Sequence, residues 1–184
     1  MMKKSILIAL ALLAVLPAPA AHAENGPLTL LLSGGREDNT ISIALSVDGR
    51  DYVITSVAML EAGGDICSHP EERMTELVCK APAIAGFEVN AGGGRDSVIL
   101  ASDVPIPATL RGGPGKDRLV GGGISDKLVG GPGDDVLEGR RGDDLILGGP
   151  GSDRLLGGPD DDQLRGGPDR DVLVGGPGHN SLLQ

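Results

Sequence analysis

The sequence has almost no aromatic residues. Trp is absent, and Tyr52 and Phe87 are the only aromatic side chains among 184 residues. A carbohydrate, nucleic-acid or ring-cofactor site that works by stacking therefore has no rings to use. Basic residues are also outnumbered, since 16 Lys and Arg face 26 Asp and Glu and give a net charge of −10. We therefore expect no binding to nucleic acid through phosphate neutralisation.

Histidine and cysteine are scarce. Beyond residue 23 the only histidines are His69 and His179. No HExxH or G-x-S-x-G motif and no Cys–His pair in a suitable context occurs, so we expect no enzymatic activity. Cys67 and Cys79 are the only cysteines. Their spacing is wider than that of a C-x-x-C redox site, and in an oxidising compartment we expect a disulfide, with two separate thiols as the alternative.

Long apolar runs are missing except at the start. Lys3 and Lys4 precede an apolar run at residues 6–16, which is followed by prolines and by the small-residue triplet Ala21-His22-Ala23. This order is typical of a secretory signal peptide at residues 1–23, cleaved after Ala23, and the run is too short to span a bilayer. The remaining chain has 14 basic and 26 acidic residues, a net charge of −12. We expect a secreted protein without a membrane span, and the choice between periplasm and medium stays open.

Glycine, in contrast, is abundant, and it recurs with a period of nine. The 31 glycines are too many for a helical globule, and no Gly-x-y period of collagen is present. Eight blocks follow one another without a gap from residue 112 to residue 183: GGPGKDRLV, GGGISDKLV, GGPGDDVLE, GRRGDDLIL, GGPGSDRLL, GGPDDDQLR, GGPDRDVLV and GGPGHNSLL. An earlier block at residues 91–99, AGGGRDSVI, has the same pattern, and 12 residues separate it from the array.

The eighth position of the block predicts the core. It is aliphatic in every block: Val98, Leu119, Leu128, Leu137, Ile146, Leu155, Leu164, Leu173 and Leu182. We expect one inward-pointing aliphatic side chain per short strand, stacked between two sheets, with two blocks per turn and equivalent residues 18 apart. Val89 and Leu110 are expected to extend this ladder. Position nine, as in Val120 and Leu147, would face outward and is more apolar than a solvated face requires. This predicts self-association, packing on the N-terminal module or a cell-surface partner.

The sixth position predicts a cation site. It holds Asp96, Asp117, Asp126, Asp135, Asp144, Asp153, Asp162, Asp171 and Asn180. Stacked one strand spacing apart, at about 4.8 Å, two carboxylates repel by about 3 kcal/mol at an effective dielectric constant of 20. Such a column is unfavourable unless a cation lies between its members. In the alternative interpretation, each Asp only caps backbone N–H groups.

The remaining positions of the block suggest which cation. The repeats contain no Cys and one His, so the donors are carboxylate and carbonyl oxygens, which suit Ca²⁺. Glycines at positions one, two and four permit positive φ angles that aim carbonyls inward, and we add these to the candidate metal ligands: Gly112, Gly115, Gly130, Gly133, Gly148 and Gly151. Weaker or missing ions are expected beside the irregular residues Ile124, Arg140, Arg141, Asp160, Asp169 and Asn180.

The region before the repeats predicts antiparallel strands. Residues 28–32 are a candidate strand ended by Gly34-Gly35, and residues 41–47 alternate apolar and small polar side chains. Asp48-Gly49 is a turn signal, and residues 52–57 complete a hairpin. We therefore place a small antiparallel β module with one disulfide at residues 24–90.

The block G-G-x-G-x-D-x-U-x, in which U is a large aliphatic residue, resembles the RTX or haemolysin-type calcium-binding nonapeptide repeat. The resemblance covers residues 91–184 and implies a parallel β-roll, a two-sheet β-helix whose turns bind Ca²⁺. We therefore expect an all-β, secreted, non-enzymatic protein that binds several Ca²⁺ ions and folds as it binds them. A calcium-dependent adhesin that uses the outer faces of the roll is the alternative.

Overall fold

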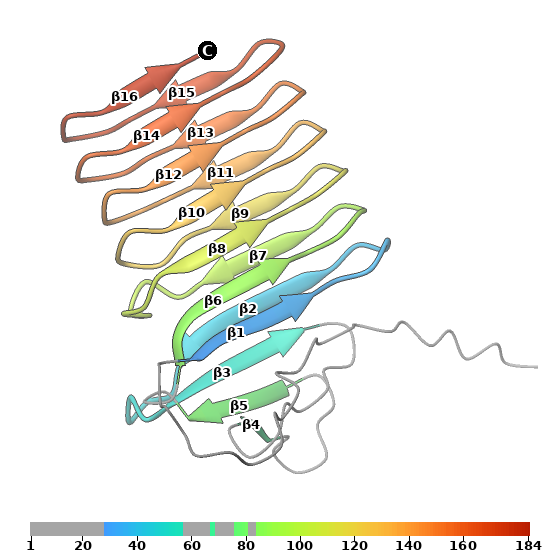
Figure 1. The fold of residues 1–184 in the computed structure, drawn as a ribbon, viewed down its shortest axis with the longest axis vertical. Helices are drawn as coiled ribbons and strands as arrows, with labels where there is room; N and C mark the ends of the chain where they lie inside the picture. Colours follow the sequence, from blue (N-terminus) through green and yellow to red (C-terminus); the bar gives the residue numbers. More distant parts are fainter. Residues whose placement is uncertain (1–27, 57–66, 69–75, 81–83) are drawn as a thin grey trace, which may run out of the picture.

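Two β-sheets lie face to face and run the length of the structure, a computed structural model that describes residues 28–56, 67–68, 76–80 and 84–184 (Figure 1). The first sheet contains, in spatial order, β1 (Leu28–Ser33), β6 (Ile84–Asn90), β8 (Ala108–Arg111), β10 (Lys127–Val129), β12 (Leu145–Leu147), β14 (Gln163–Arg165) and β16 (Ser181–Leu183). The second sheet contains β15 (Val172–Val174), β13 (Arg154–Leu156), β11 (Val136–Glu138), β9 (Arg118–Val120), β7 (Ser97–Leu100), β2 (Thr40–Leu45), β3 (Asp51–Ser56), β5 (Glu76–Lys80) and β4 (Cys67–Ser68).

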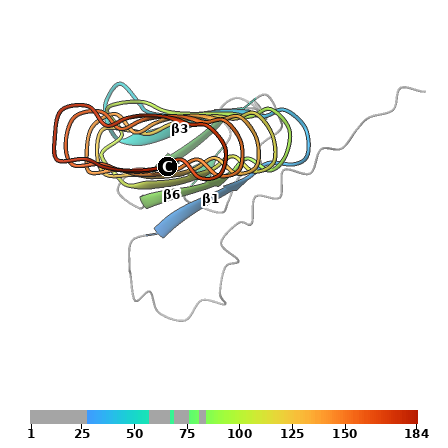
Figure 2. The same ribbon diagram turned by 90° about the horizontal axis from the view of Figure 1, so that it is seen from above.

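The chain passes from one sheet to the other at every repeat and forms flattened coils that stack on one another (Figure 2). Neighbouring strands of the repeats are parallel, and their register places residues 18 apart side by side, as in Leu119, Leu137 and Leu155. The predicted period of two blocks per turn is therefore confirmed. The expected all-β class is confirmed as well, since the described residues contain no helix. The part of the chain that the structure describes also has no helix that could cross a membrane.

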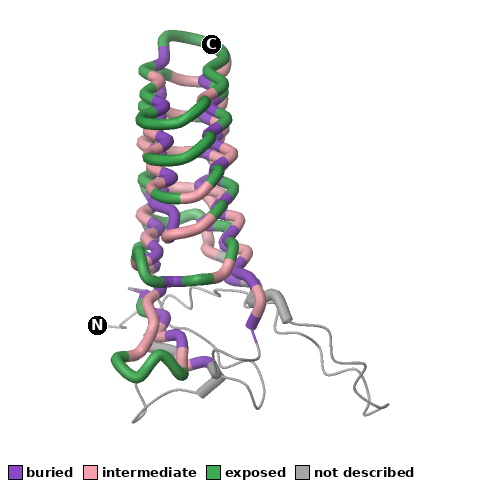
Figure 3. The backbone as a smooth tube through the Cα atoms, turned by 90° about the vertical axis from the view of Figure 1, so that its left-hand side faces the viewer, coloured by how far each residue is buried: buried purple, intermediate pink, exposed green. Residues whose placement is uncertain are grey.

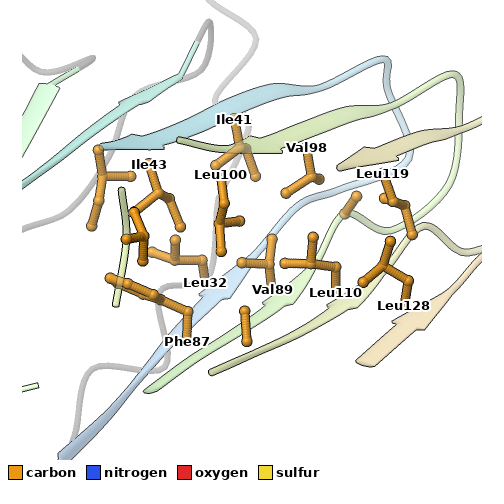
Figure 4. Packing of buried hydrophobic residues seen from close by; sticks show 14 of the residues in the cluster. Leu32, Ile41, Ile43, Phe87, Val89, Val98, Leu100, Leu110, Leu119 and Leu128 are labelled. Atoms are coloured by element: carbon orange, nitrogen blue, oxygen red, sulfur yellow. The ribbon is translucent and has the colours of Figure 1, made fainter. Parts of the chain in front are cut away.

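The core is the predicted aliphatic ladder. Val89 and Val98 pair with Leu110 and Leu119, and in Figure 4 these side chains point toward each other from the two sheets. Position eight is almost completely buried from Leu119 through Leu164, whereas Leu182 in the last strand is 47 % exposed. Exposed residues gather mainly in the turns, and buried residues recur along the strands (Figure 3).

One outward-facing residue differs from the expectation. Val120, at position nine, is fully buried, although Val174 and Leu183 at the same position are about half exposed. We attribute this to the enlarged half-turn at residues 101–107, whose carbonyl oxygens approach Gly122 and Gly123 directly after Val120. The three extra residues therefore cover one stretch of the outer surface.

The first strands also differ from the expectation. β2, β3, β5 and β4 pair antiparallel, and the predicted β2–β3 hairpin is present, although β2 ends at Leu45. β1, however, pairs parallel with β6, and β2 pairs parallel with β7. The placement of β1 in an antiparallel module is therefore wrong, because residues 28–45 form a coil of the roll. Both sheets continue past residue 90, and a boundary there remains a prediction about independent folding.

The lower end of the roll has the thickest core. Tyr52 on β3 and Phe87 on β6 contact each other edge to face, with ring centroids 5.0 Å apart. Both are buried together with Ile43 and Ile54. The two aromatic residues of the chain thus pack where the antiparallel strands meet the first coils. The predicted signal peptide at residues 1–23 lies outside the described residues.

Candidate metal site

The turns of the repeats align their sixth residues into two columns. The first column lies at the turns that lead from the first sheet to the second, and it contains Asp96, Asp117, Asp135, Asp153 and Asp171. The second column lies at the opposite turns and contains Asp126, Asp144, Asp162 and Asn180. Every Asp in the two columns is buried. The structure therefore brings the predicted carboxylates together as two ladders.

One oxygen of each carboxylate is satisfied by the backbone. The Oδ1 atom accepts the backbone N–H of the equivalent residue in the preceding coil, for example from Asp117 to Asp135 and from Asp135 to Asp153, at 2.8 Å in both cases. The second column has the same bond from Asp126 to Asp144. The capping role considered as an alternative is therefore present, but it uses one oxygen of two.

The other oxygen is buried without a partner. Among the described residues this holds for Oδ2 of seven carboxylates: Asp96, Asp117, Asp135, Asp144, Asp153, Asp162 and Asp171. Asp126 differs, because its Oδ2 accepts the backbone N–H of Gly122 at 2.6 Å. A buried carboxylate oxygen without a donor costs folding free energy unless a proton or a cation compensates it.

Burial changes the acidity of these groups. Desolvation raises the pKa of Asp135 and Asp144 to about 7, and the carboxylates in neighbouring coils add to the shift. It raises the pKa of Asp117 to about 6. The pKa values of Asp96 and Asp153 are raised by the same cause. The folded columns therefore favour uptake of positive charge.

The first glycine of each block makes room for the free oxygen. A Cβ atom on Gly130 would lie 2.3 Å from Oδ2 of Asp135 and 2.8 Å from the carbonyl oxygen of Gly148 in the next coil. The same clash with Oδ2 recurs at Gly112 and Gly148. The predicted reason for glycine at position one is therefore wrong: these residues do not have positive φ, and they are required because a carboxylate and a carbonyl oxygen approach the α-carbon.

Positive φ angles occur at positions two and four. Gly115, Gly133 and Gly151 have φ between 134° and 152°, as expected for the fourth residue. Three substituted positions keep the conformation in spite of their side chains, because Arg140, Asp160 and Asp169 have φ of 81°, 89° and 85°. Ile124 does not, so its turn has a different backbone path. Weaker ions beside these residues remain a prediction.

The donor set fits a hard cation. Carboxylate and carbonyl oxygens converge at each regular turn, and Ca²⁺ accepts six to eight such ligands. No group of three or more His, Cys, Asp or Glu side chains in the described ranges could hold a metal ion on its own. Backbone carbonyls of the glycine-rich turns must therefore supply a large part of any coordination shell.

One member of the first column, Asn39, was not among the predicted site residues. Residues 34–42, GGREDNTIS, form a turn and strand like those of the repeats, and Ile41 pairs with Val98 at position eight. Asn39 takes the sixth position and lies before Asp96. The signal was the Gly34-Gly35 pair followed by Asn at position six and Ile at position eight. The period was concealed because residues 43–90 separate this block from the next.

With this geometry described, the comparisons with known proteins identify the repeats. A family model for the RTX calcium-binding nonapeptide repeat, in four copies, matches residues 111–146, 120–155 and 147–182. The repeat array belongs to the RTX family. RTX repeats imply calcium binding in a β-roll, which agrees with the paired sheets and the two columns. No curated protein and no solved structure shows a significant similarity to the chain.

Proposed function

We propose that this is a secreted, non-enzymatic protein whose RTX turns bind several Ca²⁺ ions and fold on binding them. The observation that carries the proposal is the set of seven buried Oδ2 atoms without a donor. In the regular turns, the carboxylates at position six and carbonyls such as that of Gly148 would hold the ions. Calcium would supply the positive charge that the columns lack.

Folding on binding follows from the balance of forces in the array. Most strands of the repeats contribute a single buried aliphatic side chain, such as Leu137 or Leu155, and most turns bury a carboxylate. Burial of one such aliphatic stabilises the fold by about 2 kcal/mol, whereas ordering a residue costs about 1–2 kcal/mol. Because the site exists only in the folded coil, the binding free energy of the ions becomes folding free energy.

A calcium titration followed by far-UV circular dichroism tests this proposal. With excess chelator we expect the repeats to be largely unfolded, and with millimolar Ca²⁺ we expect a β-sheet spectrum. An unchanged spectrum in the two conditions would contradict folding on binding. If Mg²⁺ or Zn²⁺ produced the same change, only the selectivity for Ca²⁺ would be wrong.

Secretion and the disulfide belong to the same proposal. The signal-like residues 1–23 support export, and an oxidising compartment favours disulfides. Cys67 on β4 pairs directly with Cys79 on β5 in antiparallel register. Residues opposite each other in such a pair have Cα separations within the range that a disulfide spans.

A contact surface on the roll is the second candidate function. Val172, Val174 and Leu183 are exposed by about half on the outer faces of the last strands. Apolar side chains in this position support self-association or attachment to a cell-surface partner once calcium has ordered the coils.

A further inference from the structure

Asn39 lies at the base of the first column, in the turn between β1 and β2 that precedes the turn of Asp96. Its Nδ2 atom donates to the carbonyl oxygens of Glu37 and Ala91, at 2.5 and 3.0 Å, and to Oδ1 of Asp96 at 2.9 Å. The residue is 3 % exposed. Three oxygens, two carbonyls and one carboxylate, therefore surround a single electropositive nitrogen inside the turn.

This nitrogen occupies the place of the free carboxylate oxygen in the RTX turns. A Cβ atom on Gly34 would lie 2.9 Å from Nδ2 of Asn39 and 1.9 Å from the carbonyl oxygen of Ala91. A Cβ atom on Gly130 would meet Oδ2 of Asp135 and the carbonyl of the next coil in the same way. Ala91, like Gly148, is the first residue of its block. The base thus has an amide nitrogen where the coils above it have a carboxylate oxygen.

Arg140 closes the base of the second column in a related way. Its Nη1 atom donates to the carbonyl oxygens of Leu100 and Gly121, at 2.6 and 3.1 Å. Leu100 and Gly121 are the first residues of the first two half-turns on that side of the roll. Asp126, the first carboxylate above them, has both oxygens bonded, to Ala108 and Gly122.

We propose that Asn39 and Arg140 are built-in substitutes for calcium that close the base of each column. The base of the roll then forms without ions and is the template on which the calcium-dependent coils stack. This inference rests on the proposed function, since it concerns the same columns. It adds which turns of the columns bind no ion and which residues take the place of the ion there.

Asn39→Asp tests the first column in the full-length protein. The substitution places a carboxylate oxygen among three oxygens, so we expect one additional Ca²⁺ ion by isothermal titration calorimetry. In chelator we expect faster amide exchange at Ile41 and Val98. Asn90→Asp is the matched control, because it adds the same charge at an exposed residue near the first turn, and we expect it to change neither measurement.

Arg140→Gly tests the second column. Glycine is the usual residue at this position of the block and suits the φ of 81°, so a merely space-filling Arg would make the variant equally or more stable. We expect the reverse at limiting Ca²⁺, where the array is partly folded, with faster exchange at Leu110 and Leu128, because two carbonyls lose their donor. The calcium count should not change, since Ala108 occupies the place of a sixth-position Asp in this half-turn.

Asp135→Asn and Asp135→Ala provide the converse test, which holds even if Asn39→Asp fails to fold. Both should bind fewer ions than the parent. The Asn variant should fold at a lower Ca²⁺ concentration than the Ala variant, because its amide can repeat the bonds of Asn39.

If the parent protein binds no calcium, the proposed function is wrong. If the parent binds calcium but Asn39→Asp matches Asn90→Asp, or Asp135→Asn matches Asp135→Ala, the inference about the base is overturned.

Discussion

The base of the roll and the RTX array use the same turn with opposite requirements. In the base, the sixth position holds Asn39, whose amide nitrogen binds three oxygens. In the array, the same position holds a carboxylate such as that of Asp135, whose Oδ2 has no donor. Both turns continue into parallel strands of one sheet, although Gly35 and Glu37, at positions two and four of the base turn, lack the positive φ of the array. In our proposal, the atom at this place, an amide nitrogen or a carboxylate oxygen, determines which coils need a cation.

The cores of the two regions differ in the same sense. The base contains the edge-to-face pair of Tyr52 and Phe87, with Ile43 and Ile54 buried beside it. An aromatic side chain buries 150–250 Å² and dominates the energetics of a small core. Most strands of the array bury a single aliphatic side chain. The base can therefore be stable by hydrophobic burial, whereas the array depends on what its columns bind.

The largest effect is expected from removing two free carboxylates from the first column. Asp135→Ala with Asp153→Ala should raise the calcium concentration at the folding midpoint by about tenfold or more. Each substitution removes a charged ligand and also a hydrogen bond to a charged group, which alone is worth about 1.5–3 kcal/mol. Asp143→Ala with Asp161→Ala is the matched control. These exposed residues at position five also accept one backbone N–H from a neighbouring coil, at 3.0 and 2.7 Å.

Circular dichroism at increasing Ca²⁺ compares the two double variants. The control should stay within about threefold of the parent, because an exposed charge contributes less than about 1 kcal/mol. Equal shifts in the two variants would mean that the overall acidity of the array, and not the geometry of the columns, binds the ions.

The array was the part of the fold that the sequence could predict. A strict period of nine with an aliphatic at position eight predicts that residues such as Leu119 and Leu137 stack between the two sheets. This position is aliphatic in every repeat. The same regularity placed the carboxylates at the turns. Because the same pattern recurs in adjacent repeats, a local irregularity such as Ile124 did not obscure it.

The base could not be predicted in this way. Residues 34–42 are a single repeat separated from the others by an insertion, so no periodicity marked them. The pairing of β1 with β6 depends on contacts between distant segments, which alternation within a strand does not encode. The role of the first glycine was also missed, because the approach of Oδ2 to Gly130 is a tertiary contact. The roles of Asn39 and Arg140 could not be predicted, because most of their hydrogen-bond acceptors belong to distant segments of the chain.

A smaller effect is expected from pH, and it should change the stability of the array, whose columns contain the buried carboxylates. Burial raises the pKa of Asp135 and Asp144 from 3.8 to about 7. Between these values the folded array binds more protons than the unfolded chain, so its stability falls as pH rises from about 4 to 7. In metal-free protein, protons should therefore substitute partly for calcium. We expect more β-sheet at pH 5 than at pH 8.

The measurement is a thermal melt of metal-free protein across this pH range. An increase of 1 kcal/mol corresponds to about 4–8 °C in Tm for a small domain. With saturating Ca²⁺ the trend should reverse, because protons compete with the ions for the same carboxylates. A metal-free array that becomes more stable toward pH 8 would show that the columns do not take up protons in the folded state.

The smallest effect on the array is expected from the cysteines. The variant with Cys67→Ser and Cys79→Ser removes the proposed disulfide, which would close a loop of about a dozen residues worth about 3 kcal/mol in the loop-entropy model. β4 and β5 lie at one end of the second sheet, and β13 and β15 lie at the other. We therefore expect Ile43 and Val53 to lose hydrogen-exchange protection with calcium present, whereas Leu137 and Leu155 keep it. Loss of protection at all four residues would show that the base and the array are one cooperative unit, because the sheet that joins β2 to β7 would then transmit the loss. The boundary near residue 90 would in that case be wrong.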